Sequence, residues 1–221
     1  MTFPRTPTPA RRTRWRSLAA LVVLVAATAC GVDVDSSPRP VRAEPSTTTT
    51  SSVPERGRAE VVLYYVREGT LLPVIDELSN RGLESTLRAQ LQPPDGSVAV
   101  VGLGTSIPAG TELLSIARTD RTLRINLSEA FDNVVGLSRQ QAIGQLVLTA
   151  TQVAEVSDVI FEVDGEQITV SSPSRGDRTV VSACDFRSLL ATVDDASKAS
   201  LPYESVDVLA QRRVALDAEC S

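Results

Sequence analysis

Apolar residues recur along this chain with two different spacings, and these spacings outline an alternation of strands and helices. The run from Val61 to Val66 is continuously β-branched or aromatic and ends at Glu68-Gly69, which predicts a buried strand. Leucine then recurs at every fourth position from Leu83 to Leu91. That spacing predicts one face of a helix, which Pro93 brings to an end.

Two short apolar segments follow, and their separation is typical of a hairpin. Residues Glu112 to Arg118 and Leu123 to Leu127 are expected to be strands. The polar pair Asp120-Arg121 lies between them and supplies the turn.

The strongest helical pattern begins near Ser138. Ser138 and Gln141 have the spacing of a capping box. An apolar stripe with helical spacing comes next: Ala142, Ile143, Leu146, Val147, Ala150, Val153 and Ala154. Gly144 costs about 1 kcal/mol of helix propensity relative to alanine, so we expect it to serve a close packing contact.

Alternating apolar residues from Val159 to Val163 predict one further strand, and Asp164-Gly165 then predicts a hairpin turn before Ile168 and Val170. The order of elements is β, α, β, β, α, β, β. It favours an α+β fold over residues 59–172, with a single mixed or antiparallel sheet and helices packed on one face. Residues 173–221 are expected to be a C-terminal helical extension, with helical spacing near Phe186 and again from Ser205 to Glu219.

The N-terminal 29 residues have the layout of a secretory signal. Five arginines precede an apolar run from Leu18 to Ala27, and small residues lead to Cys30 and Gly31. This context resembles the bacterial lipobox, although Ala27 stands where leucine is usual. The resemblance implies that Cys30 carries a diacylglycerol anchor and becomes the mature N-terminus. The alternatives are a signal cut after Ala29 without lipid and a transmembrane anchor, for which the run is short.

Residues 30–58 are rich in serine, threonine and proline, with a low-complexity run from Ser46 to Ser52. Such a composition buries too little apolar surface to fold, so we expect a disordered tether. Removal of residues 1–29 takes five positive charges and no acidic residue, which changes the formal net charge from −5 to −10. A nucleic-acid partner is therefore not expected, because no basic footprint remains. The membrane link is expected to be the lipid on Cys30.

Composition also limits the chemistry. The sequence contains no histidine, which excludes Ser-His-Asp and Cys-His catalysis, and Lys198 is the only lysine. Ser106 and Ser128 have no base within motif range, so no catalytic residue is predicted. The acidic residues Asp158, Glu162, Asp164 and Glu166 suggest a Ca²⁺ cluster, but solvated hairpin faces explain them better. We predict no metal site and no cofactor.

Two cysteines remain once Cys30 is assigned to the anchor. Cys184 and Cys220 lie in the exported part of the chain, where an even number of cysteines predicts a disulfide. Two free buried thiols are the alternative. A bond between them would fasten the last helix to the end of the sheet.

Four blocks in the chain resemble the GerMN domain of sporulation and spore-germination proteins. The most specific one runs from Gly102 to Thr111 (GLGTSIPAGT), and the others are Leu123 to Phe131, Gln145 to Thr149, and Val159 to Gly165. Asn126 stands where the family usually has aspartate. The resemblance implies an α/β fold like that of ring-building motifs and no established catalytic residues. It also implies that export as a lipoprotein is common.

These observations predict a non-enzymatic lipoprotein at the outer face of the cytoplasmic membrane. We expect it to mediate protein–protein association, with another envelope protein or with itself, through an exposed sheet edge. The alternatives are a module that binds cell-wall glycan or peptide, an accessory of an envelope signalling system, and an envelope hydrolase that uses paired carboxylates.

Overall fold

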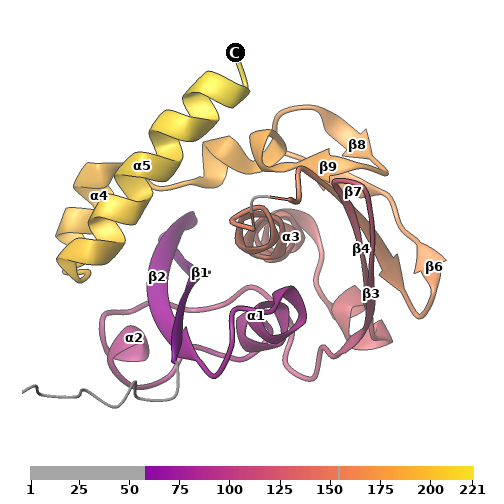
Figure 1. Ribbon diagram of the computed structural model, residues 1–221, viewed down its shortest axis with the longest axis horizontal. Helices are drawn as coiled ribbons and strands as arrows, with labels where there is room; N and C mark the ends of the chain where they lie inside the picture. Colours follow the sequence, from indigo (N-terminus) through magenta and orange to yellow (C-terminus); the bar gives the residue numbers. More distant parts are fainter. Residues whose placement is uncertain (1–57, 154) are drawn as a thin grey trace, which may run out of the picture. The chain divides into compact units, whose positions relative to one another are not determined.

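The computed structural model describes residues 58–153 and 155–221, and within them the elements are stacked in layers (Figure 1). The predicted signal, the tether up to residue 57, and Cys30 lie outside the described residues. The α+β class with a C-terminal helical extension is confirmed. The strands form one five-stranded sheet and two separate hairpins instead of the single sheet that the sequence predicts.

The first layer is an antiparallel hairpin of β1 (Ala59–Arg67) and β2 (Thr70–Leu78), joined by the turn at Glu68-Gly69. The first strand was predicted, but β2 was not, because Pro73 interrupts its apolar run. Pro73 pairs with Tyr64, and this pair directs its backbone groups away from the partner strand. The missing N–H of Pro73 is therefore not needed for the hairpin ladder.

Helices cover both faces of this hairpin. On one side, α3 (Gly136–Ala150) contacts β1 and β2, and α1 (Leu83–Gln90) contacts α3. On the other side lie α4 (Val193–Lys198) and α5 (Tyr203–Glu219), and α5 contacts β2 (Figure 1). The five-residue helix α2 (Gly96–Val100) follows α1.

The five-stranded sheet lies beyond α3. Its order is β3-β4-β5-β6, formed by Leu113–Thr119, Thr122–Leu127, Asp158–Val163 and Glu166–Gln167, and β9 (Val181–Ser182) also pairs with β5. The hairpins at Asp120-Arg121 and Asp164-Gly165 are confirmed. Strands β4 and β5 are parallel, and the 3₁₀ turn η1 (Glu129–Asn133) and α3 connect them. Alternate residues of both strands are buried in one core with α3: Leu123, Ile125, Leu127, Val159, Phe161 and Val163.

Helix α3 begins two residues before the predicted cap. Its N-cap is Val135, without a side-chain hydrogen bond, so the predicted capping box at Ser138 and Gln141 is wrong. The side chain of Gln141 is used elsewhere, as described below. The expected packing role of Gly144 is confirmed, since a Cβ there would lie 2.9 Å from a methyl carbon of Leu71 and 3.3 Å from the Phe186 ring.

The small hairpin of β7 (Val170–Ser172) and β8 (Gly176–Arg178) crosses the predicted start of the C-terminal extension at residue 173. The predicted helix near Phe186 is a 3₁₀ helix, η2 (Ala183–Leu189), with Phe186 fully buried. The predicted helix from Ser205 to Glu219 is confirmed as α5.

Candidate interaction surface

Among the residues that the structure describes, no strand pairs with the outer edge of β3, the first strand of the five-stranded sheet. The two-residue loop makes Thr119 and Thr122 a hydrogen-bonded pair, and Ala117 pairs with Arg124 in the same way. The alternation of the antiparallel ladder then turns the N–H and C=O groups of Ile116 and Arg118 away from β4. Within residues 58–153 and 155–221, no hydrogen bond reaches these outward groups.

Two features limit how far this edge is open. A register shift between Leu113 and Ser115 bulges the strand at its start, and bulges restrict pairing at sheet edges. At the other end, the Arg118 guanidinium forms an ion pair with Glu155. Hydrogen bonding from Arg118 lowers the pKa of the Glu155 carboxyl. Leu114, the residue at the bulge, is 45% exposed.

The edge of β1, in contrast, is covered by glutamine side chains. The buried amide of Gln90 accepts a hydrogen bond from the Tyr64 N–H at 2.7 Å and donates one to the Tyr64 carbonyl at 2.8 Å. Gln145 donates to the same carbonyl at 2.6 Å, and Thr149 donates to Gln90. These side chains take the place that a neighbouring strand would occupy.

The signature segment from Gly102 to Thr111 completes the cover on β1. Val66 and Gly104 exchange two backbone hydrogen bonds of 2.7 and 2.8 Å. Gln145 also accepts from the Ser106 N–H at 2.9 Å, while Gln141 accepts from the Ser106 hydroxyl and donates to the Gly69 carbonyl. The signature residues and the helix residues that resemble the family therefore hold β1 in place.

The C-terminal extension covers the edge of β2. The Ala191 N–H donates to the Leu71 carbonyl at 2.9 Å, and the Ile75 N–H donates to the Ser205 hydroxyl at 3.4 Å. Pro73, between these two positions, has no N–H to satisfy. Both edges of the hairpin are thus occupied.

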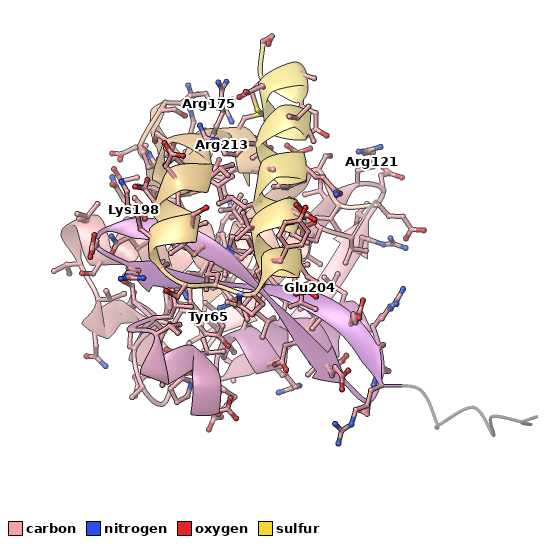
Figure 2. All side chains as sticks on the ribbon, turned by 90° about the vertical axis from the view of Figure 1, so that its left-hand side faces the viewer. Tyr65, Arg121, Arg175, Lys198, Glu204 and Arg213 are labelled. Atoms are coloured by element: carbon pink, nitrogen blue, oxygen red, sulfur yellow. A yellow bond between two sulfur atoms is a disulfide. The ribbon has the colours of Figure 1, made fainter. Side chains whose placement is uncertain are left out.

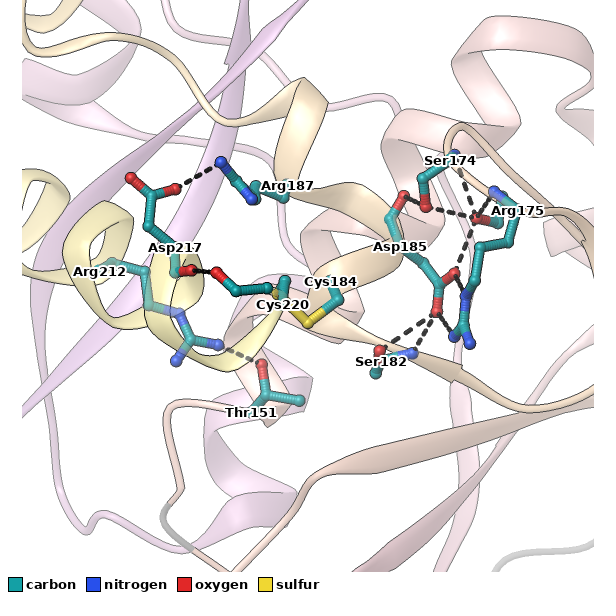
Figure 3. Close-up of a disulfide and its surroundings, with 12 residues drawn as sticks. Thr151, Ser174, Arg175, Ser182, Cys184, Asp185, Arg187, Arg212, Asp217 and Cys220 are labelled. Atoms are coloured by element: carbon teal, nitrogen blue, oxygen red, sulfur yellow. Dashed lines mark hydrogen bonds and ion pairs between the residues drawn. A yellow bond between two sulfur atoms is a disulfide. The ribbon is translucent and has the colours of Figure 1, made fainter.

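A cross-link and an ionic cluster hold this extension (Figure 3). The structure joins Cys184 in η2 to Cys220 at the end of α5, with the Cα atoms 5.6 Å apart. Beside this link, Asp185 has a fully buried side chain that accepts from Arg175, Ser172 and the Ser182 N–H. Burial acts to raise the pKa of Asp185, but the hydrogen bonds from Arg175, Ser182 and Ser172 prevail and lower it.

Three other residues considered in the sequence analysis, Ser106, Ser128 and Glu162, form hydrogen bonds or ion pairs within the fold. Ser106 bonds to Gln141, and the Ser128 hydroxyl accepts from the Glu112 N–H at 2.9 Å. Glu162 forms an ion pair with Arg124. In the part of the chain that the structure describes, no three acidic, histidine or cysteine side chains are grouped as metal ligands would be. None of the helices in these residues has the length and apolar character needed to cross a bilayer.

The family model named Germane, described as sporulation and spore germination, matches residues 44–169 of the chain. That stretch is more than half of the chain, and it holds all four of the blocks that resemble the GerMN domain. The chain belongs to the Germane family. The C-terminal extension, which covers the edge of β2, lies beyond the matched residues. No curated protein matches the sequence.

Several solved structures are similar to part of this Germane chain. The tandem GerMN domains of the sporulation protein GerM from Bacillus subtilis share 18% identity over 58% of this chain, with a TM-score of 0.46. The first GerMN domain of the same protein shares 19% identity over 56% of this chain and 95% of that one, with a TM-score of 0.41. A Clostridium perfringens protein, described provisionally as a lipoprotein, shares 24% identity over 61% of this chain and 94% of its own, with a TM-score of 0.39. The chain spans 48% of the tandem-domain structure.

Proposed function

We propose that this Germane protein is a non-enzymatic lipoprotein, anchored through Cys30 at the outer face of the cytoplasmic membrane, and that it associates with other proteins through the free edge of β3. The observation that carries the proposal is the set of outward backbone groups at Ile116 and Arg118, beside the exposed Leu114. A strand from a second copy or from another envelope protein pairs with these groups by β-augmentation. The absence of histidine from the sequence supports a role without acid–base catalysis.

The association is tested by site-specific photo-crosslinking of the full chain in its own membrane. A photoreactive residue at Ala117, whose side chain is exposed on β3, should form a protein adduct, and mass spectrometry identifies the partner. The same residue at the exposed Asp177 in β8 is the control and should form no such adduct. Equal adducts at both positions, or none at Ala117, would contradict the use of this edge.

The anchor is tested separately. Mass spectrometry of the membrane-extracted protein should find an acylated cysteine at its N-terminus, and Cys30→Ser should release the chain from the membrane fraction. A Cys30→Ser variant that remains equally membrane-bound would contradict the proposed lipid anchor. It would not bear on the proposed contact at β3.

A further inference from the structure

A cavity of about 300 Å³ lies on the face of the β1–β2 hairpin that is turned away from α3. Tyr65, Val74 and Asp76 share this face of the hairpin, since residues at alternate positions of paired strands point to the same side. The short helix α2 and the α4–α5 connector, Ser200 to Pro202, form the other walls. Figure 2 shows Tyr65 on this side of the molecule, near the end of α5 that carries Glu204.

The walls of the cavity are mainly apolar. They are formed by Val74, Ile75, Val98, Val101, Leu103, Leu201 and Pro202. Pockets for whole cofactors or drug-sized ligands begin at about this volume. The cavity is therefore suited to a single side chain or a ligand of similar size.

The polar side chains that line the cavity are those of Tyr65, Asp76, Asp95 and Ser200, and Asp76 accepts a hydrogen bond from the Glu77 N–H at 2.8 Å. The Tyr65 residue is 6% exposed, and its hydroxyl, which is not itself buried, makes no hydrogen bond with any described residue. The carboxylates of Asp76 and Asp95 are exposed at the rim. Neither forms an ion pair with an arginine or lysine in the described ranges. Burial, and then the nearby charges of Asp76 and Asp95, raise the pKa of Tyr65 to about 12, so both carboxylates act on this hydroxyl.

We infer that this cavity binds a lysine-type side chain of a peptide, with the alkyl stem along the apolar wall and the ammonium at the rim between Asp76, Asp95 and Tyr65. An ammonium has three donors, and the cavity offers it three separate acceptor groups. Lysine commonly buries its stem along apolar surface while the charged end stays at the water boundary. The ring of Tyr65 adds an aromatic surface that attracts cations. The inference goes beyond the proposed function and does not depend on β3, because α3 lies between this hairpin and the sheet.

The test uses the full chain in detergent micelles at low salt, with a blocked alanyl-lysyl-alanine peptide as the probe. Isothermal titration should show weak binding, with a Kd on the order of 1 mM. The same peptide with norleucine in place of lysine keeps the alkyl stem and lacks the charge. Its affinity should be lower by about fivefold or more. Equal binding of the two peptides, or no binding of either, would overturn the inference.

Variants locate the binding. Asp76→Asn and Asp95→Asn should each weaken the lysine peptide about fivefold, the change expected for loss of one exposed charge partner. Tyr65→Phe removes only the unpartnered hydroxyl and should weaken it less. Asp194→Asn, an exposed acid in the first turn of α4 and outside the cavity lining, is the matched control and should leave binding unchanged. A loss as large in Asp194→Asn would show a nonspecific charge effect and refute the site.

Two further arms address other occupants. Tighter binding of free 1,5-diaminopentane than of the lysine peptide would show a small-diamine site and contradict a peptide ligand. Tighter peptide binding by the double variant Arg39→Gln/Arg42→Gln would show that these two arginines of the chain's own tether compete for the cavity, which would also overturn the inference. Unchanged binding in the double variant supports an external peptide.

Discussion

The β1–β2 hairpin and the β3 edge solve the same physical problem in different ways. Every outer strand leaves backbone donors and acceptors without partners. In the hairpin, Gln90, Gln145 and Gly104 satisfy β1, and the extension satisfies β2. On β3, a bulge and the Arg118–Glu155 ion pair are the features among the described residues that limit access. The difference is that the outward backbone groups of the hairpin have partners within the described residues, whereas those of Ile116 and Arg118 on β3 have none there.

The largest expected effect concerns the cover on β2. Replacement of both cysteines, Cys184→Ser with Cys220→Ser, should destabilise the full chain by about 4 kcal/mol, the chain-entropy value for a loop of 36 residues. Urea denaturation measures this loss. Hydrogen exchange should also accelerate at the Ile75 amide, which the extension protects, and much less at Ala117, which pairs inside the sheet. Thiol labelling of the denatured, unreduced protein checks the bond itself, and full labelling of both cysteines would refute it.

The second effect concerns the cover on β1. Gln90→Leu keeps the approximate volume but leaves the buried Tyr64 N–H without an acceptor, which should cost about 2–3 kcal/mol. Gln211→Leu, at an exposed position of α5, is the control and should change the free energy of unfolding by no more than about 0.5 kcal/mol. Urea denaturation of both variants decides the matter. Equal stabilities would mean that the glutamine cover is dispensable.

The third effect is a loss of folding stability at low pH, which Asp185 in the extension should cause. Its pKa is lowered in the folded protein, so the ionised carboxylate favours the folded state above its unfolded pKa of about 3.9. That contribution should be lost as the pH falls below about 4 and passes through the lower folded pKa. Asp185→Asn should remove this part of the acid branch in a stability-versus-pH series. Asp177→Asn should retain it, and a variant of Asp185 with the wild-type acid branch would contradict the assignment.

The smallest effect concerns the open edge of β3. Leu114→Glu should weaken homotypic association about two- to fivefold, because it removes an exposed apolar contact and adds like charge. Val214→Glu, which makes the same type of change at an exposed site on α5, should leave association unchanged. The proposed removal of residues 1–29 leaves a formal charge of −10, so the contact should strengthen as salt screens the repulsion. Sedimentation velocity across a salt series measures both effects, and a monomer under all conditions would rule out self-association.

Local patterns in the sequence were sufficient for most of the elements. The apolar run of β1, the four-residue leucine spacing of α1, and the two-residue turns of the main sheet each depend on neighbours in the chain, so their identity is readable from the residues. The strand β2 was not predicted, because Pro73 has no N–H to donate to a ladder. The strand still forms, because the backbone groups of Pro73 are turned away from its partner strand β1. The capping box failed because Gln141 makes longer-range hydrogen bonds to Ser106 and Gly69 instead.

The sequence by itself determined the class of fold, many of its elements, the family to which the chain belongs, and the two cysteines that the structure joins. Only the tertiary structure decided which strand edges are open. Gln145 reaches Tyr64 across 81 positions and Ser205 reaches Ile75 across 130, and no local spacing encodes such partners. The acceptors at the Tyr65 cavity come together in the same way, since Asp76, Asp95 and the α4–α5 connector meet only when the hairpin, α2 and the extension pack. Periodicity is a property of one segment, whereas the availability of a backbone group or a cavity depends on everything that packs against it.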